Sequence, residues 1–203
     1  MPGDDGATFG KRIVVVGSSC SGKSTLGSRL ANALDVPFVE LDALYWRPNW
    51  QPTPDDEFAR KILAATEGER WVMAGNYNRH TLSTAWPRAD TVIWLDFPLH
   101  LVLWRIVRRS WTRSRSKELL WGTNTEPFWG QFKLWSDESL IGYTLRTHRQ
   151  RRTFYHDRIA SPAWSHVTFI HVRTRQEAER IAKNAERAAS RQPVCLKPPG
   201  TTG

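Results

Sequence analysis

A glycine-rich segment near the start of the chain carries the residue types that bind phosphate. Residues 17–24 read Gly-Ser-Ser-Cys-Ser-Gly-Lys-Ser, a full match to the pattern G-x-x-x-x-G-K-[ST]. In such a loop, backbone N–H groups surround the phosphate oxygens, a lysine reaches the β and γ phosphates, and a hydroxyl binds Mg²⁺. We therefore expect Lys23 to act on the phosphates of ATP and Ser24 to bind Mg²⁺. The complete nucleotide-binding set predicted here is Gly17, Ser18, Ser19, Cys20, Ser21, Gly22, Lys23, Ser24 and Thr25.

The residues on either side of this loop predict the elements that must position it. Residues 13–16 are Ile-Val-Val-Val, an apolar β-branched run typical of a buried parallel strand. Leu26, Leu30 and Leu34 are spaced four apart, which indicates the apolar face of a helix that begins near Lys23. A strand, a glycine turn and a helix N-terminus together form an anion site. The alternative, a glycine turn that binds nothing, is disfavoured by this context.

The rest of the chain alternates between strand and helix patterns. Apolar runs predict further strands at residues 37–41, 71–74, 91–95 and 167–172. Helical patterns follow at residues 55–67, 99–109, 131–159 and 175–189. This alternation predicts an α/β fold with a parallel sheet covered by helices on both faces. We expect one domain over residues 11–190, with disordered ends at residues 1–10 and 191–203. Residues 110–130 lose the periodicity and are predicted to form a lid insertion.

Composition limits the classes of partner. The net charge of +9 alone would favour a nucleic acid. However, the arginines fall in two clusters, around residues 105–115 and 146–158, and a phosphate-handling cleft also needs arginines. We therefore expect no specific nucleic-acid partner. The chain has two cysteines, no apolar run of membrane-spanning length and no signal-peptide pattern, which favours a cytoplasmic protein. The oligomeric state is not indicated.

Polar residues at the carboxyl ends of the predicted strands are the next candidates, because parallel sheets bind ligands there. Asp96 ends the fourth strand and is predicted to bind Mg²⁺ with Ser24; the alternative is a helix cap before Pro98. Asp42 ends the second strand and could hold the acceptor hydroxyl or act as its base. An ordinary turn-forming aspartate is an equally good interpretation of Asp42.

Two further groups are candidates for substrate contact. Gly75 and Asn76 follow the third strand, where a glycine would allow close approach of the acceptor, and Arg79 could bind an acidic group on it. Arg105 and Arg109 lie one helical turn apart on a shared face and could converge on the transferred phosphate. The alternatives are a strand-ending turn for the first group and a solvated basic face for the second.

Several stretches together resemble a known family. They are residues 17–25, Leu-Asp-Ala-Leu-Tyr-Trp at 41–46, residues 71–77 with Gly-Asn-Tyr, and residues 89–96, which end in Ile-Trp-Leu-Asp. The chain resembles the adenylate-kinase-like branch of P-loop kinases and, more narrowly, the bacterial topology modulation protein family. The resemblance implies a three-layer P-loop NTPase fold with a five-stranded parallel sheet in the order 2-3-1-4-5. It also implies that Arg105 packs on adenine and that Arg109 contacts phosphates. No AMP-binding motif is recognisable.

These observations predict a kinase that uses ATP and Mg²⁺ and transfers the γ-phosphoryl group to a small acceptor such as a nucleotide. Lys23, Arg109 and Asp42 are the predicted catalytic residues. The alternative is a nucleotide-binding regulatory or nucleic-acid-associated protein with slow or no kinase activity. Acceleration of ATP consumption by a small acceptor distinguishes the two.

Overall fold

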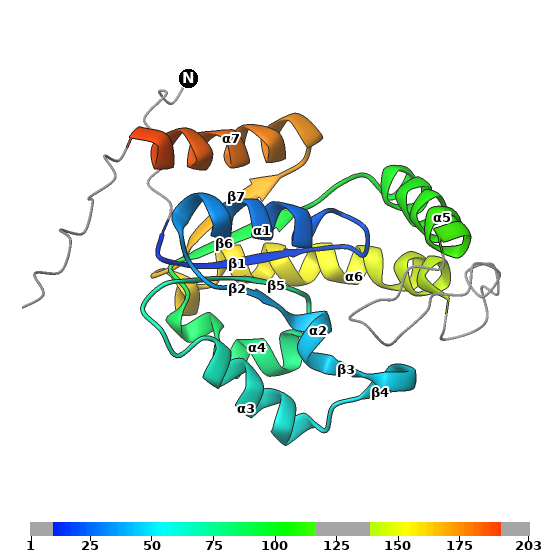
Figure 1. Cartoon of the computed structure of the whole chain (residues 1–203), viewed down its shortest axis with the longest axis horizontal. Coiled ribbons are helices and arrows are strands. Elements are labelled where there is room, and N and C mark those ends of the chain that lie inside the picture. Colours follow the sequence, from blue (N-terminus) through cyan, green and yellow to red (C-terminus); the bar gives the residue numbers. More distant parts are fainter. Residues whose placement is uncertain (1–9, 117–138, 192–203) are drawn as a thin grey trace, which may run out of the picture.

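The structure is a computed structural model that describes residues 10–116 and 139–191. Its centre is a five-stranded sheet in the order β2-β5-β1-β6-β7, with every neighbouring pair parallel (Figure 1). Numbered only among themselves along the chain, these strands follow the predicted order 2-3-1-4-5. The strands are β1 (Arg12–Gly17), β2 (Phe38–Glu40), β5 (Trp71–Ala74), β6 (Thr91–Leu95) and β7 (Thr168–Val172).

β1 lies in the middle of the sheet and is apolar on both faces. Val14 pairs with Met73 of β5 on one side and with Val92 of β6 on the other, and all three side chains are fully buried. A strand that contacts helices on both faces must be apolar throughout, which explains the continuous run that predicted it. The loop that leaves β1 therefore starts from a rigid position.

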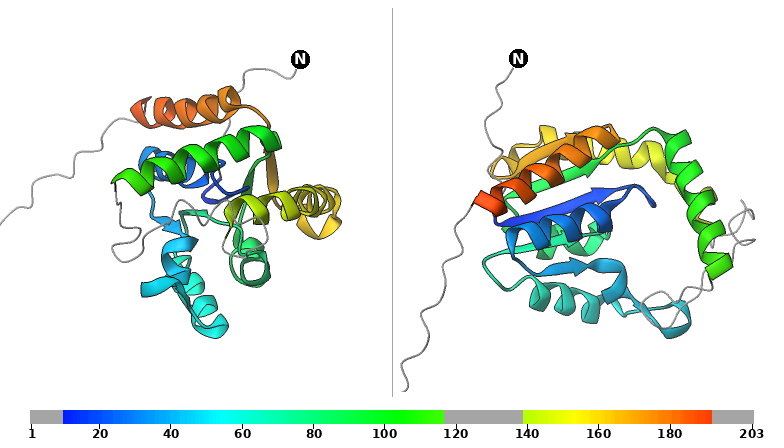
Figure 2. Two further views of the ribbon diagram at one scale, coloured as in Figure 1. Left: turned by 90° about the vertical axis from the view of Figure 1, so that its right-hand side faces the viewer. Right: turned by 45° about the horizontal axis from the view of Figure 1, so that its top comes forward.

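Helices cover the two faces of the sheet and complete the three layers (Figures 1 and 2). One apolar cluster joins buried side chains of the sheet to those of three helices, and a second cluster joins the sheet to three more and to the short helix that follows β2. The first three are α1 (Lys23–Leu34), α5 (Leu99–Ser116) and α7 (Arg175–Arg191). The second three are α3 (Asp55–Ala65), α4 (Asn78–Thr84) and α6 (Leu140–Ala160).

A small excursion follows β2. The short helix α2 (Leu41–Tyr45) leads into β3 (Trp46–Arg47) and β4 (Gln51–Pro52), which pair only with each other, in antiparallel fashion. The 3₁₀ turn η1 (Pro48–Trp50) closes this hairpin. Two other 3₁₀ turns are η2 (Trp86–Arg88) and η4 (Pro162–Trp164). The sequence predicted a strand through residue 41, whereas Leu41 already begins α2 and is fully buried.

The helix predicted for residues 99–109 continues to Ser116, so the loss of helical structure expected from residue 110 onward was wrong for 110–116. The guanidinium groups of Arg108 and Arg115 lie over the rings of Trp104 and Trp111, each four residues earlier. Such cation–π contacts stabilise this part of the helix, although both tryptophans are exposed. Because the face that carries them is not buried, the periodicity of apolar residues does not predict it.

The remainder of the predicted lid, residues 117–130, lies outside the described residues, as do residues 1–9 and 192–203 of the two predicted disordered ends. The helix predicted over 131–159 is described from Leu140 to Ala160. Among the helices of the described ranges, none has both the length and the apolar character needed to cross a bilayer.

Candidate functional site

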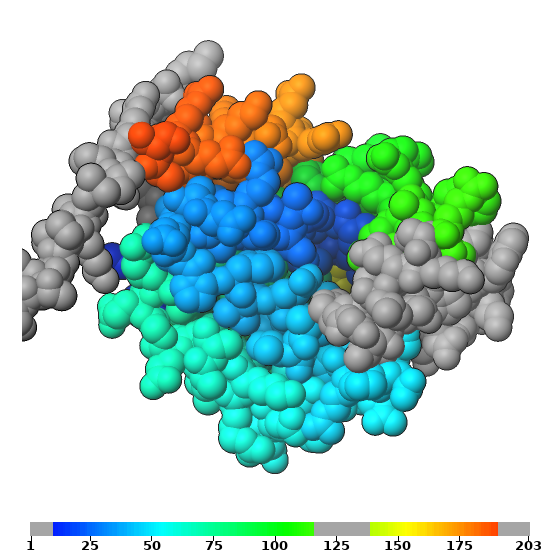
Figure 3. All heavy atoms as spheres, viewed as in Figure 1, coloured from blue at the N-terminus to red at the C-terminus, as the bar shows by residue number. Residues whose placement is uncertain are grey.

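The glycine-rich loop leaves the carboxyl end of β1 and enters α1. Gly17 has φ +151°, and a Cβ atom there would lie 2.6 Å from the carbonyl oxygen of Leu95. This oxygen belongs to the backbone of β6 and cannot move aside as a flexible side chain could. Gly22 has φ +95° directly before α1, in the left-handed region that favours glycine. Both glycines of the motif are therefore needed for the loop to adopt this backbone conformation. The surface of this part of the chain lies between α7 and α5 (Figure 3).

The loop also makes hydrogen bonds within itself. The amide of Ser21 donates to the carbonyl of Ser18 at 3.1 Å, and the Nζ of Lys23 donates to the same carbonyl at 3.0 Å. Ser18 and Ser21 are buried, whereas Thr25 is exposed on α1. Cys20, with φ +56°, adopts a left-handed conformation at the top of the turn. The structure thus folds the predicted phosphate-binding residues into one compact turn.

Lys23 lies among charged groups that change its pKa. Removal from water lowers its pKa from 10.5 to about 8, because burial disfavours the charged ammonium. The negative charge of Asp42 opposes this effect, and the positive charges of Arg151 and Arg109 add to it. These groups come from four different parts of the chain. The charges of Asp42, Arg109 and Arg151 therefore all act on Lys23.

Asn76 connects the phosphate loop to the end of β5. The amide of Gly17 donates to its Oδ1 at 3.0 Å, and its Nδ2 donates to the carbonyl of Gly17. Asn76 therefore satisfies both backbone groups at the first residue of the loop. The phenol of Tyr155, from α6, donates to the same Oδ1 at 3.4 Å. The sequence predicted Asn76 as an acceptor-binding residue, and the structure uses its side chain to hold the loop.

Ser24 donates its hydroxyl proton to Oε1 of Glu40 at 2.7 Å. Glu40 is the last residue of β2, so the parallel sheet brings it beside the start of α1. A hydroxyl and a carboxylate are hard oxygen donors of the kind that Mg²⁺ prefers, so this pair fits the ion. The sequence analysis missed Glu40 because it reads as an ordinary strand residue. Its position two residues before Asp42, at a strand end, was the available signal.

Asp42 lies in the first turn of α2 rather than at the end of the strand. Its Oδ1 accepts a hydrogen bond from the phenol of Tyr77 at 2.7 Å. Tyr77 follows Asn76 directly, so two consecutive residues bind the phosphate loop and Asp42.

The predicted arginines of α5 lie beside the loop. Arg105 donates to the carbonyl of Ser21 at 3.1 Å, and its guanidinium lies 4.7 Å from the centre of the Phe97 ring. Burial lowers the pKa of Arg105, and the nearby charge of Arg175 lowers it further. Arg109 influences Lys23, as described above.

Arg151 also influences Lys23, although the sequence analysis assigned the arginines of residues 146–158 no site. It comes from α6, far along the chain from the loop. No spacing in the sequence could have identified it, because only the packing of α6 at the end of the sheet places it there.

Three of the residues predicted to bind metal or acceptor have neighbours that differ from those expected. Asp96 forms ion pairs with the Nε of Arg152 at 3.1 Å and with His171 at 3.0 Å, and its side chain is 4% exposed. The ion pairs compete with the predicted metal role, which stays a prediction. At Gly75, the space that a Cβ would occupy is filled by Leu41 at 2.7 Å rather than left for an acceptor. Arg79 is 83% exposed and pairs with Asp55 at 3.1 Å.

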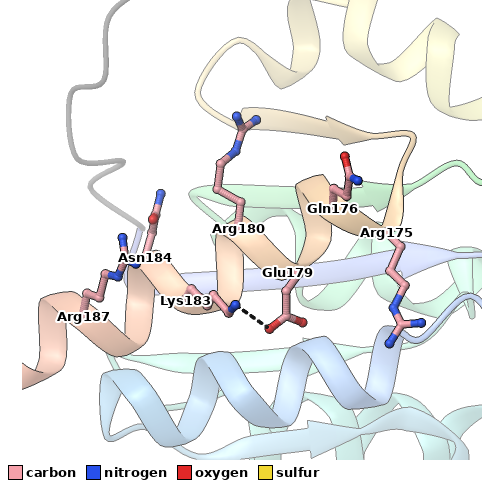
Figure 4. A pocket seen from close by; sticks show the side chains of 7 residues that line it. All are labelled: Arg175, Gln176, Glu179, Arg180, Lys183, Asn184 and Arg187. Atoms are coloured by element: carbon pink, nitrogen blue, oxygen red, sulfur yellow. Dashed lines mark ion pairs between the residues drawn. The ribbon is translucent and has the colours of Figure 1, made fainter.

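A shallow hollow on the outer face of α7 is a separate basic feature. It is lined by Arg175, Gln176, Glu179, Arg180, Lys183, Asn184 and Arg187 (Figure 4). Its one carboxylate, on Glu179, is bound by Arg29 of α1 at 2.7 Å. This contact joins α7 to α1 and gives the hollow a structural role. It contains none of the residues predicted to bind nucleotide, so we place the candidate site at the phosphate loop.

The fold and the loop together define the class: the chain has the P-loop kinase fold of the adenylate-kinase-like type. The structure resembles that of shikimate kinase from Bacteroides thetaiotaomicron with a TM-score of 0.51 and 16% identity, over 88% of this chain and 98% of that one. At this identity the likeness concerns the fold alone. No family model matches the chain.

Two curated sequences are also similar. The shikimate kinase of Novosphingobium aromaticivorans is 35% identical over 85 residues, which are 39% of this chain and 44% of that enzyme. The shikimate kinase of Paramagnetospirillum magneticum is 34% identical over 116 residues, which are 50% of this chain and 59% of that enzyme. The chain thus spans about half the length of the curated relatives that it matches.

Proposed function

We propose that this protein is a kinase that transfers the γ-phosphoryl group of Mg·ATP to a hydroxyl group of a small acceptor. The observation that carries the proposal is the placement of two carboxylates from one short segment. Glu40 accepts a hydrogen bond from Ser24 at the start of α1, and the charge of Asp42 raises the pKa of Lys23. The fold and the similarity to shikimate kinases support the same activity.

The donor side uses the loop, the lysine and the arginines. Backbone amides of the loop would hold phosphate oxygens at the N-terminus of α1, where the helix dipole favours negative charge. Lys23, which now bonds to the carbonyl of Ser18, would turn to the β and γ phosphates. Arg109 and Arg151 would stabilise the charge on the transferred group, and Arg105 would pack on adenine. Ser24 and Glu40 would hold Mg²⁺, which would supply positive charge to neutralise the phosphates.

The acceptor side centres on Asp42. Its carboxylate would accept the hydrogen bond of the attacking hydroxyl and take its proton as the oxygen bonds to the γ-phosphorus. As the bond to the γ-phosphorus forms, the bond between that phosphorus and the bridging oxygen of ADP breaks. Asp42 is suited to this role because its charge already acts on Lys23, which would bind the phosphates. We also propose that the protein is related to the topology modulation proteins and that it acts in the cytoplasm.

The test is an acceptor screen that measures ADP release from Mg·ATP. Shikimate, gluconate, nucleosides and nucleoside monophosphates are each added to the purified protein. We expect one acceptor class to raise ADP release well above the rate in buffer, with the phosphorylated acceptor seen by mass spectrometry. Lys23→Met should abolish the reaction, and Lys61→Met, which changes a lysine paired with Glu57 on α3, should not. Binding of Mg·ATP without acceleration by any acceptor would favour the regulatory alternative.

A further inference from the structure

The ring of Tyr77 packs against two other rings, and its phenol is directed at Asp42. The ring centre of Tyr77 lies 4.6 Å from that of Tyr45 and 5.0 Å from that of Phe58. Phe58 is fully buried in the core, so this packing restricts the motion of the phenol. Its hydroxyl donates to Oδ1 of Asp42 at 2.7 Å, a short distance that is typical of a bond to a charged acceptor.

The backbone places this contact next to the loop contact described above. Asn76 binds both backbone groups of Gly17, and the following residue binds Asp42. Gly75, with φ +151°, precedes Asn76. Because it has no Cβ atom, the side chain of Leu41 of α2 can pack directly against its backbone. Three consecutive residues after β5 therefore fix the phosphate loop and the segment carrying Asp42 relative to each other.

We propose that Tyr77 is a positioning residue for phosphoryl transfer, whose hydroxyl holds Oδ1 of Asp42 so that Oδ2 is presented to the acceptor hydroxyl. This inference rests on the proposed function, because it assigns Asp42 to the acceptor. One carboxylate oxygen is engaged by the phenol and the second is left for substrate. The Asn76–Tyr77 pair then sets the separation between the phosphate donor and the group that receives the proton.

The phenol of Tyr77 is suited to donate a hydrogen bond to Asp42 at every pH near neutrality. Burial raises the pKa of Tyr77, and the adjacent charge of Asp42 raises it further, so the hydroxyl keeps its proton throughout the neutral range. A residue that never gives up this proton cannot act as the base itself. Its contribution is orientation, and misplacement of a reacting group by about 1 Å can cost roughly a hundredfold in rate.

Tyr77→Phe removes the hydroxyl and keeps the ring. With the acceptor found by the screen, we expect kcat to fall roughly 10- to 100-fold while the KM for Mg·ATP stays within about twofold. Tyr45→Phe is the matched control, because it removes a hydroxyl from the neighbouring ring, whose described side-chain contacts are ring contacts. It should leave both constants near their wild-type values.

A double-mutant cycle tests whether Tyr77 acts through Asp42. In an Asp42→Asn background, Tyr77→Phe should lower the residual kcat by less than about twofold, because its effect has already been lost. Equal losses in both backgrounds would overturn the proposal, as would a Tyr77→Phe variant with wild-type kcat. A rise in the KM for Mg·ATP equal to the fall in kcat would also overturn it, since a general distortion of the site would then explain the loss.

Urea unfolding of the wild type, Tyr77→Phe, Asp42→Ala and the double variant provides a readout without turnover, since Asp42→Ala removes the oxygen that accepts from Tyr77. Tyr77→Phe should raise the unfolding equilibrium constant roughly tenfold in the wild-type background and much less beside Asp42→Ala. If no acceptor is phosphorylated but this coupling is present, the proposed function is wrong, while the hydrogen bond between Tyr77 and Asp42 is confirmed. If an acceptor is phosphorylated and the coupling is absent, the positioning role alone fails.

Discussion

Asn76 binds Gly17 through both of its backbone groups: its side-chain oxygen accepts the Gly17 amide at 3.0 Å, and its side-chain nitrogen donates to the Gly17 carbonyl. An amide is the only common side chain that can accept and donate at adjacent atoms in this way. The first residue of the phosphate loop is thereby attached to the neighbouring strand, and the conformation of the loop depends on a residue 59 positions away.

Asn76→Ala should weaken Mg·ATP binding roughly tenfold and destabilise the fold by about 1–3 kcal/mol, because two backbone groups lose their partner. Isothermal titration calorimetry measures the affinity, and urea unfolding measures the stability. Asn78→Ala, which changes an asparagine that accepts from Tyr155 at 3.3 Å, is the control and should leave the affinity unchanged. Equal affinity in Asn76→Ala would show that the loop holds its shape without this contact.

Lys23 predicts a pH dependence of nucleotide binding. In the free protein its pKa is lowered to about 8, and bound phosphate favours the charged ammonium, so binding above this pH requires proton uptake. The affinity for Mg·ATP should therefore be nearly constant from pH 6.5 to 7.5 and should fall as the pH rises from 8 to 9.5. Calorimetric titrations across this range measure the effect.

Lys23→Met should bind weakly at every pH and should lack this decrease. Lys61→Met should retain the wild-type pH dependence. A decrease of the same size in Lys23→Met would mean that another group titrates in this window.

Glu40 and Asp96 are competing candidates for the carboxylate near the metal. Glu40→Gln should raise the Mg²⁺ concentration for half-maximal activity roughly tenfold, because the carboxylate beside Ser24 loses its charge. Asp96→Asn should instead lower stability, by about 1–3 kcal/mol, because its ion pairs with Arg152 and His171 are lost. Magnesium titrations and thermal melts of both variants separate the two effects. A higher Mg²⁺ requirement in Asp96→Asn with an unchanged melting temperature would establish the role predicted from sequence.

The start of α7 predicts an acid-sensitive contribution to stability. Glu177 accepts from the amides of Arg173 at 2.7 Å and Thr174 at 3.3 Å, and its own amide donates to the hydroxyl of Thr174 at 3.2 Å. This is a capping box, and the backbone hydrogen bonds hold the pKa of Glu177 below its usual value. Because the folded-state pKa is lowered, the contribution is present above the unfolded pKa and is lost as the pH falls through the folded one.

Glu177→Gln should lower stability by about 0.5–1 kcal/mol at pH 7 and by much less near pH 3. Glu69→Gln, in the exposed loop before β5, is the control and should have little effect at either pH. A loss of equal size at both pH values would mean that the charge of Glu177 is not what stabilises the cap.

The sequence predicted the sheet well because its strands are buried on both faces. β1, β5 and β6 each appear as an uninterrupted apolar run, and the loop motif fixes which strand is central. The short β2 was predicted too long because Leu41 is buried in a helix rather than in a strand, and an apolar residue gives the same signal in both. The extension of α5 was missed because exposed tryptophans paired with arginines conceal the helical period.

The candidate site was predictable where a local pattern encodes it. The loop residues and Asp42 could be found from a motif and a strand end. Glu40 could not, because its contact with Ser24 exists only once β2 lies beside the start of α1. Arg151 depends in the same way on the packing of α6. Asn76 was found, but its role was not, since a side chain that binds backbone looks the same in sequence as one that binds substrate.

Within the described residues, the hairpin of β3 and β4 forms a two-stranded sheet separate from the main sheet. Residues 46–52 can therefore be exchanged for a loop of another length without breaking any strand pair of the five-stranded sheet. The hairpin follows Asp42 by only a few residues, so such an exchange would change the surroundings of the aspartate to which we assign the acceptor without altering residues 17–25. If that assignment holds, the length and sequence of this one hairpin are a means of changing acceptor preference independently of nucleotide binding.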